Sequence, residues 1–391
     1  MPKRKNTRAA QGSGTIRERK DGRWEARYTI GRDPGTGKQI QKSIYGDTQK
    51  DVLQKLQQVQ GDINNGIYME PSKMTLGQWL DVWLKDYTAN IKPATLHAYK
   101  GRVEYRIKPA IGALKLSTLK PHMVQSFYNS LQQSEKGKDA LSPKSIQNVH
   151  GILHKALEQA VELGYMKINP TNACKRPRVE KPEIRPLDSE QIAAFLGAIK
   201  DHRFESFYTV DLFLGLRQGE LLGLQWSDVD LKTGVIRVSK QLQLLDGEYT
   251  FRIVKNDKVR TITPAKFVID MLKGHYSKQC EDRLRAGAAW NDGDFVFCNE
   301  IGEHLSRSTT YHSFKAIIAS IGLPETRFHD LRHTYAVASL LAGDDIKTLQ
   351  ENLGHHTAAF TLDTYAHVTE EMKKDSAARM DAFIQRIKSS G

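Results

Sequence analysis

The chain has 391 residues, of which 39% are hydrophobic and 26% are charged, a composition typical of globular proteins with buried cores and roughly two to three domains. The net charge of +13 favours a polyanionic partner, although charge alone does not distinguish DNA from RNA or an acidic membrane surface. No apolar run approaches the roughly 20 residues of a membrane span, and no apolar stretch follows the basic first residues, which argues against a secretory signal.

The beginning of the chain predicts a small sheet domain. Residues 1–12 are small and basic, and we expect them to stay disordered until they bind a partner. Residues 13–68 predict a three-stranded sheet backed by one helix. The strand-like runs are 15–20, 23–30 and 38–45, with the hairpin signal Asp21-Gly22 after the first. Apolar residues then recur at helical spacing from Val52 to Ile63, and Asp47 is the expected N-cap.

One face of this predicted sheet is basic. Trp24, Ala26 and Tyr28 alternate onto the face that would meet the helix. By the same alternation, the outer face carries Arg17, Arg19, Arg23, Arg27, Gln39 and Gln41. A basic, twisted ribbon can enter a major groove, so we predict that this face binds DNA. The alternative is a solvated outer face without a ligand.

Residues 73–170 predict a small all-helical domain. Its apolar stripes are Trp79, Val82 and Trp83; Leu96, Tyr99, Val103 and Ile107 after Pro93; the run 121–131; and Ile146, Val149, Leu153, Ala156 and Ala160 in a long helix from Ser142-Pro143 to Asn169-Pro170. The polar run 134–139 is an expected loop. Polar stripes carry the predicted DNA contacts Lys92, Thr95, Arg102, Arg106 and Lys144. A solvated helix face explains these stripes equally well.

A stiff, basic linker is expected at residues 171–186, where Lys175-Arg176-Pro177-Arg178 is followed by two further prolines. Residues 187–391 predict a mostly helical domain with a small β-sheet, in which the strand-like runs are 235–245 and 260–263. The expected fold class is therefore multidomain α+β. A last helix carries the apolar stripe Met372, Met380, Phe383, Ile384 and Ile387. It packs either on its own domain or on a neighbouring copy, and the sequence leaves both open.

Four motifs of the final domain carry chemistry. Gly215-Leu216-Arg217 places an arginine among apolar residues, and Glu220 shares its side of a helix three residues later. The turn 254–259 contains Lys255 and Lys258, either of which would reach into a cleft. His329 and Arg332 combine a proton-transfer group with a bidentate phosphate ligand. Leu353-Gly354-His355 precedes Tyr365 by ten residues.

These motifs, in this order, resemble those of the tyrosine recombinase (lambda-integrase) family over roughly residues 75–390. The sheet domain at 13–68 is similar to the arm-binding domain of conjugative-transposon and phage integrases, and residues 73–170 to the family's core-binding domain. The resemblance implies a site-specific integrase that cleaves and rejoins DNA through a 3′-phosphotyrosyl intermediate. A type IB-like topoisomerase and a DNA-binding regulator with a decayed site are the alternatives.

The resemblance also assigns roles to residues. Tyr365 would attack the phosphate, while Arg217 and Arg332 clamp its oxygens and Glu220 orients Arg217 or His329. Lys255, preferred over Lys258 for its distance to Arg260, would be the general acid. His329 would handle protons near the tyrosine. His355, preferred over His356 for its Leu-Gly context, would stabilise the phosphate.

The physics of a phosphodiester agrees with these roles, because charge neutralisation and positioning dominate its cleavage. No cluster of Asp and Glu stands out for a two-metal mechanism, so we expect neither metal nor cofactor. Cys174, Cys280 and Cys298 lack CxxC spacing and fit a reducing cytoplasm. The expected partners are double-stranded DNA with core and arm sites, further copies in a tetramer, and a small excision factor. The expected location is the bacterial cytoplasm, at the nucleoid.

Overall fold

The structure is a computed structural model, and it describes residues 14–388 except 66–67, 69–72, 134–139, 181–183, 255–258, 356, 360, 363, 366–376, 378–379 and 382. The expectations for residues 1–12, the loop 134–139, Lys255, Lys258, His356 and Met372 therefore lie outside the described residues. The chain divides into two compact units, and the division follows Glu180. This point falls within the expected linker 171–186, while the domain boundaries themselves stay a prediction.

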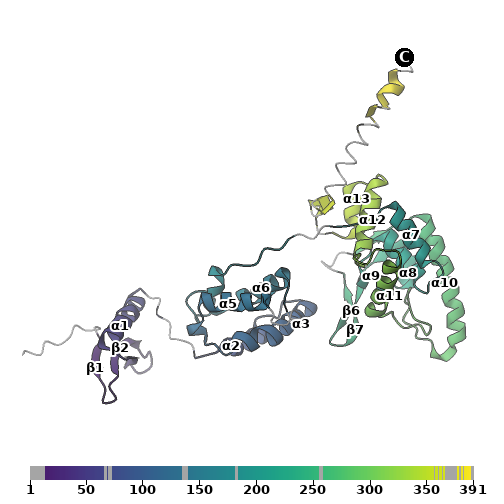
Figure 1. Ribbon diagram of the computed structural model, residues 1–391. Helices are drawn as coiled ribbons and strands as arrows, with labels where there is room; N and C mark the ends of the chain where they lie inside the picture. Colours follow the sequence, from purple (N-terminus) through teal and green to yellow (C-terminus); the bar gives the residue numbers. More distant parts are fainter. Residues whose placement is uncertain are drawn as a thin grey trace, which may run out of the picture. The chain divides into compact units, whose positions relative to one another are not determined.

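The N-terminal body is a three-stranded antiparallel sheet with one helix on one face (Figure 1). Its elements are β1 (Thr15–Glu18), β2 (Trp24–Arg32), β3 (Gln39–Gly46) and α1 (Gln49–Asn64). Ala26 and Tyr28 of β2 are buried together with Val52 and Leu56 of α1, as the alternation predicts. The expected N-cap was wrong by one residue. Thr48 caps α1, because its hydroxyl accepts a hydrogen bond from the backbone N–H of Asp51 at 3.2 Å.

The second body is helical. Its elements are α2 (Leu76–Asp86), α3 (Pro93–Arg102), a π-helical segment (Val103–Ile107), α4 (Lys108–Ile111), α5 (Pro121–Gln132) and α6 (Pro143–Glu162), with 3-10 turns at Leu116–Thr118 and Pro170–Ala173. All five residues expected to face inward on the long helix α6 are buried. The predicted end of this helix was wrong. It ends at Glu162, and Asn169 instead caps the turn at Pro170–Ala173 through its side chain.

Helices dominate the unit that follows residue 180 (Figure 1). They are α7 (Ser189–Ile199), α8 (Glu205–Leu214), α9 (Gln218–Leu222), α10 (Lys266–Ala286), α11 (Arg307–Ser320), α12 (Asp330–Leu341) and α13 (Ile346–Leu353), with 3-10 turns at Trp226–Asp228 and Gly287–Ala289. Leu340 of α12 is buried, but the next residue, Leu341, is 53% exposed. The consecutive positions 340 and 341 point about 100° apart on a helix, so only one of them faces the core.

The strands of this unit form two small sheets. β4 (Val229–Asp230), β5 (Val235–Val238) and β8 (Arg260–Ile262) form one, in the order β4-β5-β8, and β6 (Lys240–Leu245) pairs with β7 (Glu248–Ile253) in the other. The expected single strand 235–245 was therefore wrong, because the chain changes sheet at Ser239. The run that forms β7 was not expected as a strand. The multidomain α+β class is confirmed, with a small sheet content in a mostly helical unit.

The apolar stripe near the end of the chain is exposed where the structure describes it. Residues 383–388 are helical, and so are 377 and 380–381. The exposed fractions are 58% for Met380, 53% for Phe383, 40% for Ile384 and 58% for Ile387.

Candidate active site

Two helices end on glycines, and their last carbonyl groups hold Arg332. Gly215 follows α8 with φ 58° and Gly354 follows α13 with φ 63°, a left-handed conformation that side chains disfavour. Arg332 Nη1 donates to the carbonyl of Gly215, and Nη2 donates to that of Leu353, each at 2.6 Å. Helix C-termini leave such carbonyls without an intrahelical partner and favour cations there. The two glycine motifs therefore meet at one arginine.

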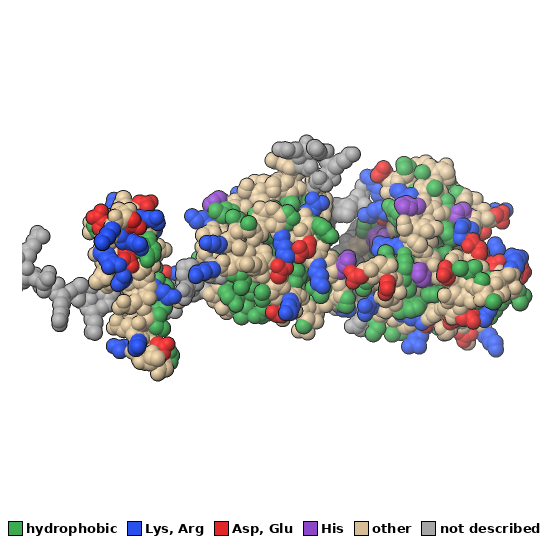
Figure 2. All heavy atoms as spheres, turned by 90° about the horizontal axis from the view of Figure 1, so that it is seen from below, with side chains coloured by type: hydrophobic (Ala, Val, Ile, Leu, Met, Phe, Trp, Pro, Cys, Tyr) green, Lys and Arg blue, Asp and Glu red, His purple; other side chains and the backbone are tan. Residues whose placement is uncertain are grey.

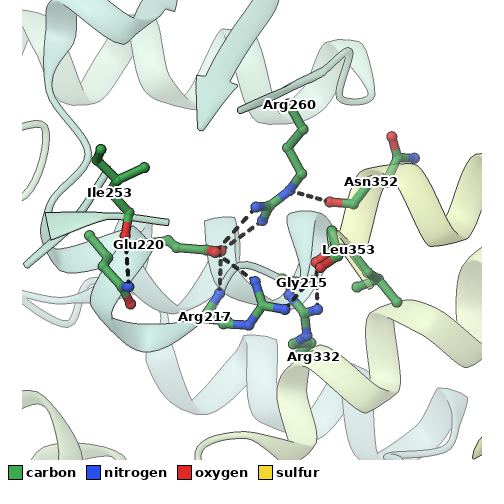
Figure 3. A network of polar contacts seen from close by, with 10 residues as sticks. Gly215, Arg217, Glu220, Ile253, Arg260, Arg332, Asn352 and Leu353 are labelled. Atoms are coloured by element: carbon green, nitrogen blue, oxygen red, sulfur yellow. Dashed lines mark hydrogen bonds and ion pairs between the residues drawn. The ribbon is translucent and has the colours of Figure 1, made fainter. Parts of the chain in front are cut away.

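Glu220 joins two further arginines, as Figure 3 shows. Arg217 Nη1 donates to Glu220 Oε1 at 2.8 Å, and Arg260 Nη2 donates to Glu220 Oε2 at 2.7 Å. Arg217 also reaches the carbonyl of Gly354 at 3.1 Å, and Arg260 that of Asn352 at 2.7 Å. The expected orientation of Arg217 by Glu220 is thus present in the geometry. Burial opposes the charge of Glu220, but its bonds and proximity to Arg260 and Arg217 lower its pKa to about 2.

Sequence reasoning missed Arg260 as part of the site. It stands at the start of β8, and no local pattern separates it from other arginines next to a strand. Only 8% of its side chain is exposed, and its contacts come from residues 40 and 92 positions away in the sequence. No short-range signal identifies such a residue.

The site keeps a positive charge although it is buried. Burial, with the nearby charge of Arg217, lowers the pKa of Arg332 to about 9, so this guanidinium stays protonated at neutral pH. Asp211 of α8 is fully buried, and neither carboxyl oxygen has a hydrogen-bond partner among the described residues. Burial raises the pKa of Asp211 well above its usual range, against the opposing charge of Arg332. Arg217, Arg260 and Arg332 thus outnumber the one carboxylate among their described partners, that of Glu220.

The two predicted histidines lie in the field of these arginines. His355 shares a hydrogen bond of 2.9 Å between Nδ1 and the hydroxyl of Thr361. Burial, followed by the charges of Arg332 and Arg217, lowers the pKa of His355 to about 3. His329 is an exposed residue, yet desolvation, followed by the charges of His333 and Arg332, lowers its pKa to about 4. Both rings are neutral at pH 7, and an anion bound beside them would raise their pKa values and favour protonation.

Tyr365 lies beside this cluster, in the core between α12 and α13. Only 1% of it is exposed, and its hydroxyl is 2.8 Å from Nδ1 of His333. Burial raises the pKa of Tyr365 to about 12, against the opposing charge of Arg332. Sequence reasoning gave no role to His333, although it stands next to Arg332 in the same motif. The missed signal is its spacing, one helical turn after His329.

The predicted lysine cannot be placed, since residues 255–258 lie outside the described part of the chain. The residues that follow it are described. Val259 and Arg260 line a depression of about 420 Å³ together with Gly354 and His355. Arg260 and His355, two residues near the phosphate-binding candidates, thus share the wall of one depression.

Comparison with known proteins agrees with this geometry. The model of the phage integrase family matches residues 185–372, and the N-terminal SAM-like domain of phage integrases matches residues 75–132. The chain is 32% identical over 379 residues to the "Tyrosine recombinase XerC-like" protein of Caldanaerobacter subterraneus subsp. tengcongensis, covering 91% of this chain and 95% of that protein. The chain belongs to the tyrosine recombinase family. It is therefore a tyrosine-type site-specific recombinase, an enzyme that cleaves and rejoins DNA strands.

Two solved structures share the fold of this recombinase. One is the Tn1549 transposon integrase in complex with transposon right end DNA, with a TM-score of 0.66 and 24% identity, covering 79% of this chain and all of the other. The second is a lambda integrase tetramer bound to a Holliday junction, with a TM-score of 0.58 and 20% identity, covering 88% of this chain and 96% of that one.

The basic face of the recombinase's N-terminal sheet is organised around Glu25. This carboxylate is 2% exposed, and it accepts hydrogen bonds from Arg17 at 2.7 Å, Arg27 at 3.2 Å and Ser43 at 2.8 Å. Glu25 thus fixes the direction of two of the four predicted arginines. Lys and Arg side chains gather visibly on this small body in Figure 2. Of the other two, Arg19 lies over the ring of Tyr45 and Arg23 beside Asp21.

The basic stripes of the helical body meet on one face. Lys155 Nζ of α6 lies 3.4 Å from the hydroxyl of Tyr99 of α3. Thr95 precedes Tyr99 by four residues and Arg102 follows it by three, so all three share a stripe. Lys144 is exposed three turns before Lys155 on α6. The remaining candidates are Lys92, at the N-cap of α3, and the partly buried Arg106 of the π-helical segment.

The part of the recombinase that the structure describes has neither a metal-binding cluster nor a membrane-spanning helix. No group of three or more His, Cys, Asp or Glu side chains there is arranged to hold a metal ion. No helix there has the length and apolar composition to cross a membrane.

Proposed function

We propose that this recombinase integrates and excises a mobile element by attack of Tyr365 on a DNA phosphate. The phenolic oxygen would bond to phosphorus and release the 5′-oxygen of the next nucleotide, leaving a 3′-phosphotyrosyl link. The observation that carries this proposal is the meeting of Arg217, Arg332 and Tyr365, from three separate motifs, in one buried cluster. A covalent link conserves the energy of the phosphodiester, so rejoining needs no nucleotide cofactor.

The arginines would stabilise the transition state. Arg217 and Arg332 each use two N–H groups on protein oxygens and keep further N–H groups for the non-bridging oxygens of the phosphate. Their positions are set before DNA arrives, by Glu220 and by helix-end carbonyls. Such preorganised donors need no reorganisation during the reaction. The positive charge of Arg217 and Arg332 would stabilise the extra negative charge that develops on the non-bridging oxygens of the phosphate.

The remaining roles concern protons. We infer that Lys255 donates a proton to the leaving 5′-oxygen, with Lys258 as the alternative on the same turn. His355 would gain a proton beside the bound phosphate and donate a hydrogen bond to it. His329 would assist proton movements near the tyrosine. No metal or cofactor is needed in this scheme, because arginine, lysine and histidine supply all the positive charge.

We propose that the helical body and the unit carrying Tyr365 bind the crossover site, while the sheet of the N-terminal body binds separate arm sites. Arg17, Arg23, Arg27 and Arg19 would meet the arm DNA, and the stripe around Tyr99 would meet the core DNA. Four copies would act together on paired sites, as in the lambda integrase tetramer bound to a Holliday junction. The exposed stripe of Met380 and Phe383 would contact a neighbouring copy. A small excision factor would assist excision, and the reaction would take place on nucleoid DNA in the bacterial cytoplasm.

The test is to trap the covalent complex on a nicked duplex that carries the element's attachment site. The nick releases a short fragment, so the reaction cannot reverse. The wild type and Tyr311→Phe, a control at an exposed tyrosine of α11, should both form the adduct. Tyr365→Phe should form none, and peptide mapping of the adduct should identify Tyr365. An adduct in Tyr365→Phe would refute the assignment.

A further inference from the structure

The partner of the nucleophile's hydroxyl is His333. The Oη of Tyr365 and the Nδ1 of His333 are 2.8 Å apart, within hydrogen-bond distance. The ring of His329, the histidine expected to serve the tyrosine, lies 5.0 Å from the ring of His333 instead. The two imidazoles meet edge to face, and His333 is the one in direct contact with the phenol.

A phenol in this position needs a proton acceptor. Tyr365 is buried beside α12 and α13, and burial keeps its hydroxyl protonated at neutral pH. A proton must leave Oη as the bond to phosphorus forms, and general-base catalysis requires an acceptor within hydrogen-bond reach. Nδ1 of His333 is the nitrogen within that reach in the described part of the chain.

The surroundings of His333 leave its ring able to accept that proton. Burial lowers its pKa below the ordinary value, so the ring is neutral at pH 7. The charged and titratable groups near it are Asp330, Arg332 and Arg327 on or beside α12, the rings of His329 and His355, and Tyr365 itself. Asp330 favours an imidazolium, while the two arginines oppose it.

We propose that His333 is the general base of strand cleavage. This inference rests on the proposed role of Tyr365 as the nucleophile. As the bond between Oη and phosphorus forms, the phenolic proton passes to Nδ1 of His333, which becomes an imidazolium. The bond between phosphorus and O5′ breaks, and the leaving oxygen takes a different proton from the general acid. In the ligation step the imidazolium returns its proton to Oη, so protons and charge balance over the cycle.

The test compares two substrates in single-turnover cleavage of the nicked duplex. One has the normal 5′-oxygen at the scissile phosphate, and the second has a bridging 5′-sulfur, which leaves without a proton. We expect His333→Ala to slow adduct formation by about 100-fold or more on both substrates. Loss of a general acid slows cleavage of the oxygen substrate only. The rate of adduct formation by Lys255→Ala should therefore return towards the wild-type rate on the sulfur substrate. Recovery of His333→Ala on sulfur would overturn the proposal.

A second variant separates proton transfer from positioning. His333→Asn can hold the hydroxyl by a hydrogen bond but cannot accept its proton, so it should be as slow as His333→Ala. Both variants should also lose the wild type's pH profile and speed up steadily with rising pH. Near-wild-type cleavage by His333→Asn would reduce His333 to a positioning residue. Faster cleavage by His333→Ala would show that the hydrogen bond with His333 holds Tyr365 in an unreactive position. Either result overturns the proposal.

Controls keep this inference separate from the assignment of the nucleophile. His312→Ala removes an exposed histidine of α11 and should leave cleavage unchanged. Thermal melting and DNA binding of each His333 variant should match the wild type, so that a folding defect is recognised. If Tyr365→Phe still forms the adduct, the proposed nucleophile is wrong. If Tyr365→Phe is inactive while both His333 variants cleave normally on oxygen, only the general base is wrong.

Discussion

Glu220 sets the balance of charge at the site, because two arginines share its buried carboxylate. No part of its side chain is exposed, whereas the side chains of Arg217 and Arg260 are 24% and 8% exposed. Removing one partner from such a buried ion pair costs about 3–5 kcal/mol, since the remaining charge loses its compensation. Sequence reasoning found Glu220 and Arg217 because they are three residues apart on one helix. It did not find Arg260, which the tertiary structure brings to them from strand β8.

Glu220→Gln should therefore lower the free energy of unfolding by about 3 kcal/mol. It should also slow adduct formation by at least about 10-fold, because Arg217 and Arg260 lose their fixed positions. Chemical denaturation and single-turnover cleavage measure the two effects. Glu351→Gln is the matched control. It breaks an exposed pair with Lys347, and a change above about 1 kcal/mol there would contradict the reasoning.

The same variant tests the pKa of Glu220. This pKa is lowered from 4.5 to about 2 in the folded protein, so the unfolded chain binds a proton more readily. The stabilisation is then complete above pH 4.5 and disappears as the pH falls towards 2. The difference in stability between the wild type and Glu220→Gln should shrink over this interval. A constant difference would show that the charge of Glu220 is not what stabilises the fold.

The histidines predict a proton uptake on binding DNA. The pKa of His355 is about 3 and that of His329 about 4, both below the ordinary 6.5, so both are neutral at pH 5.5 in the free protein. A phosphate beside them raises both pKa values, and binding should tighten as the pH falls, by at most about tenfold per unit for each proton. Calorimetry in two buffers of different ionisation enthalpy measures the uptake. His355→Asn should reduce the proton uptake. Equal binding enthalpies of the wild type in the two buffers would contradict the prediction.

Between elements, the site depends on close contacts at helix ends and at α9. The carbonyls that end α8 and α13 direct Arg332, and α9 carries Glu220 against strand β6. A Cβ on Gly223, which follows α9, would lie 2.8 Å from the backbone nitrogen of Leu242. The glycine motif at 215–223 was recognisable in the sequence, whereas its contact with β6 was not. The prediction of one strand at 235–245 did not separate β5 from β6, so it did not identify β6 as the strand that α9 contacts.

Gly223→Ala should push α9 away from β6 and destabilise the protein by about 1–3 kcal/mol, because the contact is with backbone that cannot move aside. Cleavage should slow as well, since α9 positions Glu220. Gly274→Ala, in the middle of α10, is the matched control with the opposite sign. Nothing lies within 4 Å of its added Cβ, so it should stabilise the helix by about 0.5–1 kcal/mol. Thermal and chemical unfolding give both values, and equal behaviour of the two variants would contradict the packing model.

On the scale of the molecule, the arrangement of Tyr365 bears on how the copies cooperate. Its hydroxyl contacts His333 of the same chain, and burial raises its pKa against the opposing charge of Arg332 of that chain. Each copy therefore holds a complete set of described candidates, which favours cleavage in cis. The sequence left this question open, because the nine residues between His355 and Tyr365 permit either a compact or an extended path.

Mixing two inactive variants tests cleavage in cis. Tyr365→Phe lacks the nucleophile and Arg217→Lys lacks the bidentate clamp, so neither should form the adduct at more than about 1% of the wild-type rate. In cis cleavage their mixture stays inactive on paired sites. If the tyrosine acts in trans, the mixture should regain a substantial part of the activity, with the adduct on Arg217→Lys. Tags of different size on the two variants identify which copy carries the DNA.

The sequence by itself determined the family of the protein and most of its elements, and it predicted the chemistry of the site. Alternation defined β2, helical spacing defined α6, and the ordered motifs marked Arg217, Arg332 and Tyr365. Each of these patterns can be recognised because it is contained in a short stretch of the sequence. Only the tertiary structure joined Arg260 to Glu220 and His333 to Tyr365. The two residues of each pair are 40 and 32 positions apart in the sequence. They come together because a buried charge or hydroxyl needs a hydrogen-bond partner, and only the packing of helices and strands decides which residue lies close enough to be that partner.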